Sequence, residues 1–314
     1  VEDVLRGDYP ADRLRIVVGV DAGSPEPLAG LADALAPFPA VEVVEGDPPG
    51  GKAAALNAAV RAGSGEVLVF TDTAQRFAAN AISQLARCMG LRGAGGASGH
   101  LRARGDTGVL GRFWNYETWV RQLESDLDSL VGVTGAVYAL RREAWHDLRG
   151  GLINDDLAVP LLARKSGFRV VHCPEAEAMD ERSFGREQQY QRRVRTLTGI
   201  YQLVAWYPWI GSPGANPLWV QFILHKVVRL ATPYLLAITA LWVLATGGWR
   251  LAVAGLVAVV LLGAALAGFA RRSPIAVARE AGWTLKLLIL APLAATRNAV
   301  RGDWDVWRGR PGRT

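Results

Sequence analysis

Residues 50–75 read GGKAAALNAAVRAGSGEVLVFTDTAQ, and this stretch decides the fold that we expect for the chain. It contains a glycine turn, a short amphipathic helix, a second glycine turn and, over residues 66–70, an apolar run of strand length. Asp72 follows just past the carboxyl end of that strand, where open α/β sheets place their ligand crevices. A carboxylate there can hold a divalent cation that bridges a diphosphate. Lys52, beside two glycines, can approach a phosphate closely. Taken singly, these residues also fit a plain turn and a helix N-cap.

The alternation of strand and helix starts before this stretch. Residues 15–20 and 41–44 are apolar runs of strand length, and residues 28–39 read as a helix that ends in a Pro-Phe-Pro breaker. Such alternation favours right-handed βαβ units. We therefore predict an α/β fold with a mixed, mainly parallel sheet and helices on both faces.

The pattern G-G-K-x-x-A-L-N, followed by G-E-V-L-V-F-T-D, resembles the nucleotide-sugar core of family 2 glycosyltransferases. This family includes the synthases of cellulose, hyaluronan and poly-N-acetylglucosamine. The resemblance implies a GT-A-like (Rossmann-like) domain that binds a nucleotide-diphosphate sugar, UDP-linked as in the relatives. It also implies that Lys52, Asn57 and Asp72 contact this donor.

Some positions depart from the family pattern. The family tends to carry Asp directly before Gly-Ser, where it contacts the uracil; here that position is Ala22, and Asp21 lies one place earlier. We keep Asp21 as a candidate nucleotide contact. Many members have D-x-D after the strand, but Ala74 occupies the third position here, so a bound Mg²⁺ or Mn²⁺ depends on Asp72 alone. The family's first strand has no room before residue 8, and we expect the first residues of the chain to be missing.

A second acidic centre lies at Asp155 and Asp156. In the family an acidic pair precedes a G-[YF]-R-V run, here residues 167–170, and its final Asp is the catalytic base. The resemblance thus implies that Asp156 is the base and Asp155 the neighbouring acid. A sugar hydroxyl is a poor nucleophile, so a carboxylate must accept its proton as the new bond forms. Taken alone, the pair also fits a helix N-terminus whose dipole two acids complement.

Acceptor contacts are expected from two segments. Residues 113–120 carry aromatic side chains at helical spacing around Glu117, and Trp114 is one of them. These residues are candidates for sugar stacking, although such a stripe also fits a core helix. Gly135 lies in a small-residue loop that allows close approach of a ligand to the backbone, and the matching family segment lies beside the acceptor.

A basic amphipathic helix is predicted over residues 188–199, where processive members of the family carry Q-x-x-R-W. In this chain Arg192 replaces the Gln, Arg195 keeps the Arg and Thr196 replaces the Trp. Both arginines are candidates for binding the diphosphate, since a guanidinium suits it well. A solvated basic helix face is the alternative.

The composition becomes apolar in the last third of the chain. Residues 230–249 and 251–270 are uncharged runs of 20 residues, each long enough to cross a hydrocarbon core of roughly 30 Å. A third apolar stretch, residues 281–296, fits either a span or an interfacial helix. We expect three parts: 1–205, the GT-A-like domain; 206–229, an amphipathic interfacial segment; and 230–314, transmembrane helices with a basic tail.

Charge and cysteine content suggest a location. Residues 271–314 hold nine Lys and Arg against three Asp and Glu, which accounts for the net charge of +6. By the positive-inside tendency we expect a multi-pass protein of the cell membrane, the bacterial inner membrane, with its catalytic domain in the cytoplasm. The two cysteines, Cys88 and Cys173, are expected to form no disulfide framework and fit a reducing compartment.

We therefore predict an inverting glycosyltransferase that acts on a lipid or glycan acceptor at the membrane and has no nucleic-acid partner. The alternative is a non-catalytic or truncated transferase-like scaffold, which the departures at Ala22, Ala74 and Thr196 favour. A nucleotidyltransferase of the same fold is a weaker alternative, because the chain has no Gly-rich triphosphate loop near its amino terminus.

Overall fold

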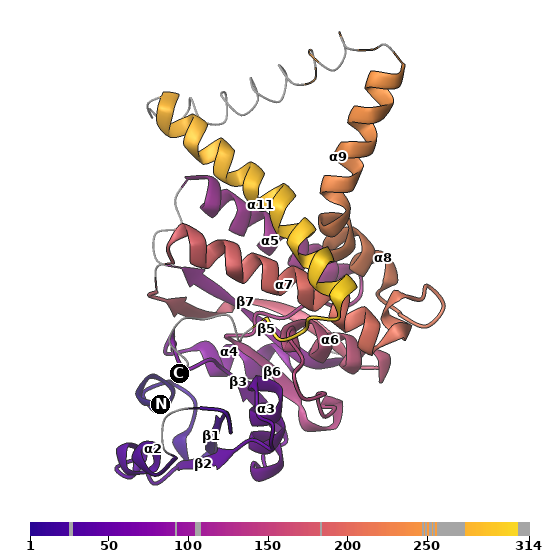
Figure 1. The fold of residues 1–314 in the computed structure, drawn as a ribbon. Coiled ribbons are helices and arrows are strands. Elements are labelled where there is room, and N and C mark those ends of the chain that lie inside the picture. The colour runs from indigo at the N-terminus through magenta and orange to yellow at the C-terminus, as the bar shows by residue number, and fades with distance from the viewer. Residues whose placement is uncertain are drawn as a thin grey trace. The chain divides into compact units, whose positions relative to one another are not determined.

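The computed structural model describes residues 1–24, 28–91, 93–103, 108–182, 184–246 and 274–306, with residues 248, 250, 253 and 255 between the last two ranges. The chain forms two compact units. The first comprises Val1–Phe184, Gln202–Phe222 and Trp304–Thr314, and the second comprises Gly185–Tyr201 and Ile223–Asp303. Figure 1 shows the order of the elements along the chain.

The first unit begins with two short helical segments, α1 (Glu2–Leu5) and η1 (Ala11–Arg13), and a small two-stranded sheet. Strands β1 (Ile16–Val20) and β2 (Val41–Glu45) pair in parallel, and α2 (Leu28–Leu35) lies between them in the sequence. Parallel strands need a crossover connection such as α2. The predicted strand–helix–strand order of this part is therefore confirmed. Helix α3 (Lys52–Ala62) follows and packs on both strands.

The larger sheet has five strands in the order β3-β6-β5-β7-β4. Only β5 and β7 pair in parallel; the other three pairings are antiparallel. The expectation of a mainly parallel sheet is therefore wrong. Helix α5 (Gly108–Leu127) is followed by a buried segment, residues 129–133, and after this segment the chain enters β6 antiparallel to β5. The strands are β3 (Val67–Phe70), β4 (Gln75–Phe77), β5 (Ala94–Ala103), β6 (Tyr138–Arg141) and β7 (Arg169–Asp180).

Helices cover this sheet and form the core with it. On one face, Leu85 of α4 (Ala81–Cys88) and the following Met89 pack against Val137, Ala139 and Val171. Successive residues of a strand point to opposite faces, so Tyr138 lies on the other face, where its ring stacks on Phe70. The other helical segments of the unit are α5 (Gly108–Leu127), η2 (Arg142–Ala144), α6 (Asp155–Lys165), η3 (Pro208–Gly211) and α8 (Trp219–Phe222).

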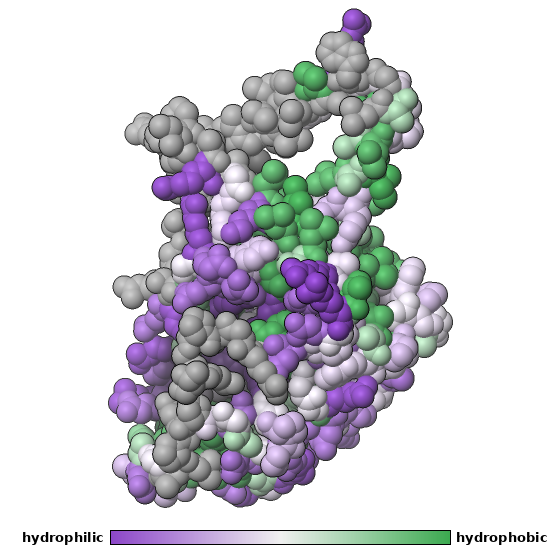
Figure 2. All heavy atoms as spheres, in the orientation of Figure 1, coloured by the Kyte–Doolittle hydropathy of each residue, from purple (hydrophilic) through white to green (hydrophobic). Residues whose placement is uncertain are grey.

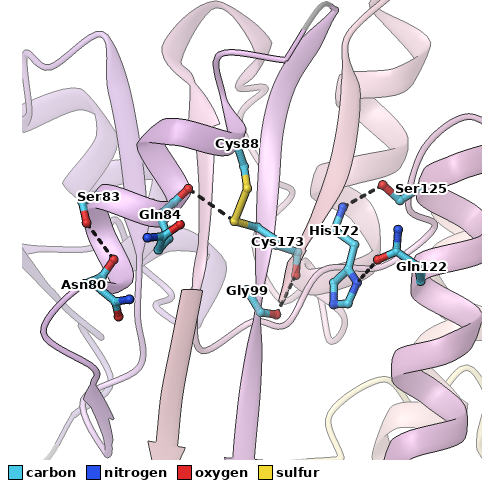
Figure 3. The surroundings of a disulfide bond; sticks show 10 residues. Asn80, Ser83, Gln84, Cys88, Gly99, Gln122, Ser125, His172 and Cys173 are labelled. Carbon is cyan, nitrogen blue, oxygen red and sulfur yellow. Dashed lines mark hydrogen bonds between the residues drawn. A yellow bond between two sulfur atoms is a disulfide. The ribbon is translucent and has the colours of Figure 1, made fainter. Parts of the chain in front are cut away.

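A disulfide joins α4 to β7. Cys88 and Cys173 are bonded across a sequence separation of 85 residues, and Figure 3 shows the bond between the helix and the strand. The expectation of two unpaired cysteines is therefore wrong. Sequence spacing does not reveal this pairing, because Cys88 ends a helix and Cys173 belongs to a strand that enters the sheet much later. Beside it, His172 Nδ1–H donates a hydrogen bond to Gln122 Oε1, and burial lowers the pKa of His172 to about 4, in keeping with a structural residue.

Reduction of this disulfide is expected to lower the free energy of unfolding by about 2–4 kcal/mol, because a long loop is then released in the unfolded chain. Denaturant unfolding of the detergent-purified protein with and without a thiol reductant measures the change. The double variant Cys88→Ala/Cys173→Ala is the control, since its unfolding should not respond to reductant. Identical curves for the wild type under both conditions would contradict the cross-link.

The second unit is helical. It contains most of α7 (Arg186–Trp206), a π-helical turn at Ile223–Val227, α9 (Val228–Ala245) and α11 (Pro274–Arg301). Thr296 of α11 joins the three helices, because its hydroxyl is bonded to the hydroxyls of Tyr201 and Tyr234. The exposed side chains of α9 are largely hydrophobic, as Figure 2 shows for the face in view.

One helix among the described residues, Trp219–Val243, is long and apolar enough to cross a membrane. It contains most of the first predicted span. The second predicted span, residues 251–270, lies almost entirely outside the described residues. The third apolar stretch lies within α11. The expected domain boundaries and the multi-pass arrangement stay predictions.

Candidate active site

The glycine loop before α3 is tied to the exit of β1. Asp21 Oδ1 accepts hydrogen bonds from the backbone N–H groups of Gly51, at 2.6 Å, and Gly23, at 2.9 Å. Gly50 and Gly51 have φ values of 90° and 97°, which side chains other than glycine rarely adopt. The Asp21 carboxylate thus holds the loop in shape. Contact of Asp21 with the nucleotide stays a prediction. One of its two carboxylate oxygens already accepts hydrogen bonds from the backbone.

Gly50→Ala is expected to weaken donor binding, because a Cβ at this position would overlap with Asp21 Oδ1 and the positive φ would be strained. We also expect a loss of about 1–3 kcal/mol in the free energy of unfolding. Denaturant unfolding and calorimetric titration with a sugar nucleotide measure the two effects. Gly63→Ala, at the other end of α3, is the matched control. Gly63 has φ −72° and its Cβ would meet only ordinary contacts, the nearest at 3.4 Å.

Lys52 connects the two acidic centres that the sequence separates by about a quarter of the chain. Its Nζ lies 3.1 Å from Asp72 Oδ1 and 3.0 Å from Asp155 Oδ2. Lys52 begins α3, Asp72 follows the exit of β3, and Asp155 begins α6. The three elements therefore converge on a single site, with Asp72 half-exposed and Asp155 buried.

The electrostatics keep Lys52 charged. Burial by itself lowers the pKa of the Lys52 ammonium, but the neighbouring charges of Asp155 and Asp72 outweigh it and raise the pKa above its ordinary value. Lys52 is therefore a cation at all physiological pH values. A cation held between two carboxylates beside a glycine loop is positioned to meet a phosphate group.

Asp156 lies beside this triad. A Cβ at position 135 would lie 3.5 Å from Asp156 Cβ and 3.9 Å from Lys52 Nζ, so the absence of a side chain at Gly135 leaves space between them. The backbone is fixed here, because Val133 N–H donates to the Asp156 carbonyl oxygen at 2.9 Å. The site therefore contains Gly135 together with both acidic centres.

Two residues of this site escaped the sequence analysis. Arg121 of α5 donates a hydrogen bond to Thr134 Oγ1, directly before Gly135. Burial lowers the pKa of the Arg121 guanidinium, and the charges of Glu117 and Asp156 act in the opposite direction. Tyr138 is the other, with 1% of its surface exposed. Neither belongs to a pattern that the sequence shows, since each reaches the site only through the packing of α5 and β6.

The other residues that the sequence predicts for the site lie in other parts of the fold, or their side chains are not among the described residues. Asn57 is buried, and its amide group exchanges hydrogen bonds of 2.8 and 2.9 Å with the backbone of Leu148. Its contact with the donor stays a prediction. Glu117 is buried on α5. The side chain of Trp114 lies outside the described residues. Arg192 and Arg195 lie on α7 within the second unit, and their contact with the diphosphate stays a prediction.

The residues at Asp72 fit a divalent cation. The Asp72 carboxylate is a hard oxygen ligand of the kind that Mg²⁺ and Mn²⁺ take, and it is 40% exposed, so a cation from solvent can reach it. Among the described residues, the one group of three or more His, Cys, Asp or Glu side chains close enough to share a metal is Cys88, Cys173 and Glu175, and both of its sulfurs belong to the disulfide.

In this α/β unit, an acidic residue at the exit of a strand and an acidic residue at the start of a helix meet beside a glycine loop. This arrangement is typical of the GT-A class of glycosyltransferases. The model of the family described as "Glycosyltransferase like family 2" matches residues 1–199. The chain belongs to this family and is a glycosyltransferase. No curated protein sequence is significantly similar to it.

A solved structure shows the same fold. The mannosyltransferase PcManGT from Pyrobaculum calidifontis, solved in complex with GDP-Man and Mn²⁺, aligns with a TM-score of 0.65 at 21% sequence identity. The alignment covers 98% of this chain and 82% of that one. A crystal structure of TarS from S. aureus aligns with a TM-score of 0.42 at 13% identity, over 68% of this chain and 40% of that one.

Proposed function

We propose that the chain is an inverting glycosyltransferase that moves a sugar from a nucleotide-diphosphate sugar to a hydroxyl of a lipid or glycan acceptor at a membrane. The observation that carries this proposal is the Lys52 ammonium, which lies within 3.1 Å of both Asp72 and Asp155. This geometry supports a site in which Asp72 serves the diphosphate and the acidic pair serves the acceptor.

In this mechanism Asp156 acts as general base. Its carboxylate accepts the proton of the acceptor hydroxyl, and the hydroxyl oxygen attacks the anomeric carbon from the face opposite the diphosphate. The bond between the anomeric carbon and the diphosphate oxygen breaks in the same step, and the nucleoside diphosphate leaves. A single displacement of this kind inverts the anomeric centre.

The leaving group gains negative charge as its bond breaks. Lys52 offsets this charge from its position between Asp72 and Asp155, and Arg192 and Arg195 are the further candidates on α7. A divalent cation bound at Asp72 would neutralise charge on the diphosphate. Asp21 and the glycine loop shape the donor side of the site, whereas Gly135, Glu117 and Trp114 are proposed for the acceptor side.

Two nucleotide sugars are each supported as the donor by a different argument. The family resemblance of the sequence implies a UDP-sugar, and the aligned mannosyltransferase PcManGT was solved with GDP-Man. The protein is expected to act at a membrane because the helix Trp219–Val243 is long and apolar enough to span one. The basic carboxyl-terminal region supports the cytoplasmic face of a bacterial inner membrane, whereas the Cys88–Cys173 disulfide is typical of an oxidising compartment.

Calorimetric titration of the detergent-purified chain with UDP and GDP, each with and without Mn²⁺, tests the proposal. Metal-dependent heat with one nucleotide is expected, followed by transfer of the matching radiolabelled sugar to membrane extract. A chain that binds neither nucleotide with metal present would instead be the non-catalytic scaffold.

A further inference from the structure

Helix α11 has a hydrophobic side that remains exposed in the folded chain. Ala291 and Ala295 of this helix are fully buried. By contrast, Leu285, Leu290 and Leu293 each keep between 41% and 57% of their surface exposed. Figure 2 shows part of this hydrophobic surface on α11. A row of exposed leucines along one helix marks a surface for contact with apolar material.

Lys286 lies within this hydrophobic side. It precedes Leu290 by four residues and Leu293 by seven, and residues at these separations share one side of a helix. The Lys286 side chain is partly exposed, and its ammonium lies 4.7 Å from the ring centroid of Tyr190 and 5.4 Å from that of Trp283. A lysine whose stem lies along apolar side chains can keep its ammonium at the boundary with water, as lysines at membrane surfaces do.

A second cation and one carboxylate lie beside Lys286. The guanidinium of Arg186, in the first turn of α7, is 5.6 Å from the ring centroid of Trp283. Glu187 Oε2 is 3.8 Å from Lys286 Nζ, but the Glu187 side chain is largely exposed, and an ion pair in such a place is weak. We call Arg186, Glu187, Tyr190, Trp283 and Lys286 the α7–α11 cluster. It combines an excess of positive charge with Trp and Tyr, the two residue types that are enriched at membrane–water interfaces.

The whole second unit is basic. Its sequence holds 13 Lys and Arg against 3 Asp and Glu, whereas the rest of the chain holds 22 against 26. Positive charge gathered next to an apolar surface is attracted to a bilayer that contains anionic lipids. The charge of the unit and its exposed leucines therefore point to the same kind of surface.

The helix α11 fits the surface of a membrane better than its hydrocarbon core. Among the described residues, the one helix long and apolar enough to span a membrane is Trp219–Val243, and α11 lies outside it. Thr296 of α11 is nevertheless bonded to Tyr234 of α9, within that helix, at 2.6 Å, so α11 stays next to the candidate span. Of the two alternatives for residues 281–296, these observations favour an interfacial helix.

An anionic phospholipid meets both requirements of this surface. Its phosphate accepts hydrogen bonds from an ammonium and a guanidinium, and its acyl chains cover the leucines. Inorganic phosphate offers nothing apolar to the leucines. A second copy of the chain would bring the same excess of positive charge against the cluster and would be repelled.

We propose that the α7–α11 cluster binds the headgroup phosphate of an anionic phospholipid, while the exposed leucines of α11 contact its acyl chains. The inference rests on the membrane location in the proposed function. It goes beyond that function by assigning a lipid-binding site to named residues and by naming the class of lipid.

Native mass spectrometry of the full chain tests the proposal, after release from nanodiscs that contain equal amounts of phosphatidylcholine and phosphatidylglycerol. The wild type is expected to retain phosphatidylglycerol about 5-fold more often. Lys286→Gln should remove this preference, because one Lys at a membrane surface contributes about this factor. Lys286→Arg should keep it. Arg87→Gln is the matched control, since it removes an exposed cation from α4 in the first unit and should also keep the preference.

Two results overturn the proposal and leave the proposed function intact: equal retention of both lipids by the wild type, or an unchanged preference in Lys286→Gln. A mass of two chains without bound lipid also overturns it, because the leucines would then belong to an interface with a second copy. The unfolding midpoint in detergent should be the same for all variants, because none of the substituted side chains is buried. If the wild type enters no nanodisc of either lipid, the membrane location and the lipid site both fall.

Discussion

Asp156→Asn is expected to reduce sugar transfer by about 10²- to 10⁴-fold while donor binding is retained. The amide cannot accept the proton of the acceptor hydroxyl, and general-base catalysis is typically of this magnitude. The substitution keeps the size of the side chain, and the backbone bond from Val133 to residue 156 does not involve it. The fold should therefore be unchanged, and the loss should appear in kcat.

Steady-state transfer and calorimetric binding of the nucleotide, measured on the same preparation, separate these effects. Asp33→Asn, an exposed acid on α2, serves as the control for a change of one charge. Loss of donor binding together with turnover would assign Asp156 to the donor rather than to the acceptor. Wild-type turnover would remove Asp156 from the mechanism.

Asp72→Asn is expected to abolish the metal dependence of donor binding and to lower transfer about 100-fold or more. A divalent cation that neutralises a diphosphate contributes several kcal/mol, and Asp72 is the ligand that we propose for it. The stability of the fold should change little, because Asp72 is 40% exposed and half-exposed ion pairs contribute about 0–1 kcal/mol. Lys52 keeps its second partner, Asp155, at 3.0 Å.

Titration of Mn²⁺ into the protein with the nucleoside diphosphate present, for the wild type and for Asp72→Asn, measures the effect directly. Denaturant unfolding checks that the variant is folded. If Asp72→Asn responds to Mn²⁺ as the wild type does, the metal is held elsewhere, and Asp72 serves only to pair with Lys52.

Much of the local structure could be predicted from the sequence. The helix over 52–62, the strand that ends at Phe70 and the helix that begins at Asp155 all lie close to where the pattern of apolar residues and turns places them. These features depend on neighbours within a few residues. The family motifs around Lys52, Asp72 and Asp156 are likewise local, and for that reason the class of enzyme is visible before the fold is known.

The direction of β6 and the pairing of Cys88 with Cys173 could not be predicted in this way. Both depend on where a chain segment returns to the sheet after a long connection, and no local pattern encodes that return. The bonds of Asn57 could not be predicted for a related reason, because its partner Leu148 lies 91 residues further along the chain.

The amino-acid sequence by itself determined the family, the candidate base Asp156, the candidate metal ligand Asp72 and the apolar segments near the carboxyl end, because motif order and hydrophobic runs are properties of neighbouring residues. Only the tertiary structure decided that Lys52 is shared by Asp72 and Asp155, that the charge of Asp156 acts on Arg121, and that the Tyr138 hydroxyl is buried without a partner among the described residues. Ion pairs and buried donors are set by distances of a few ångströms between separate elements, and such distances exist only once the chain has folded.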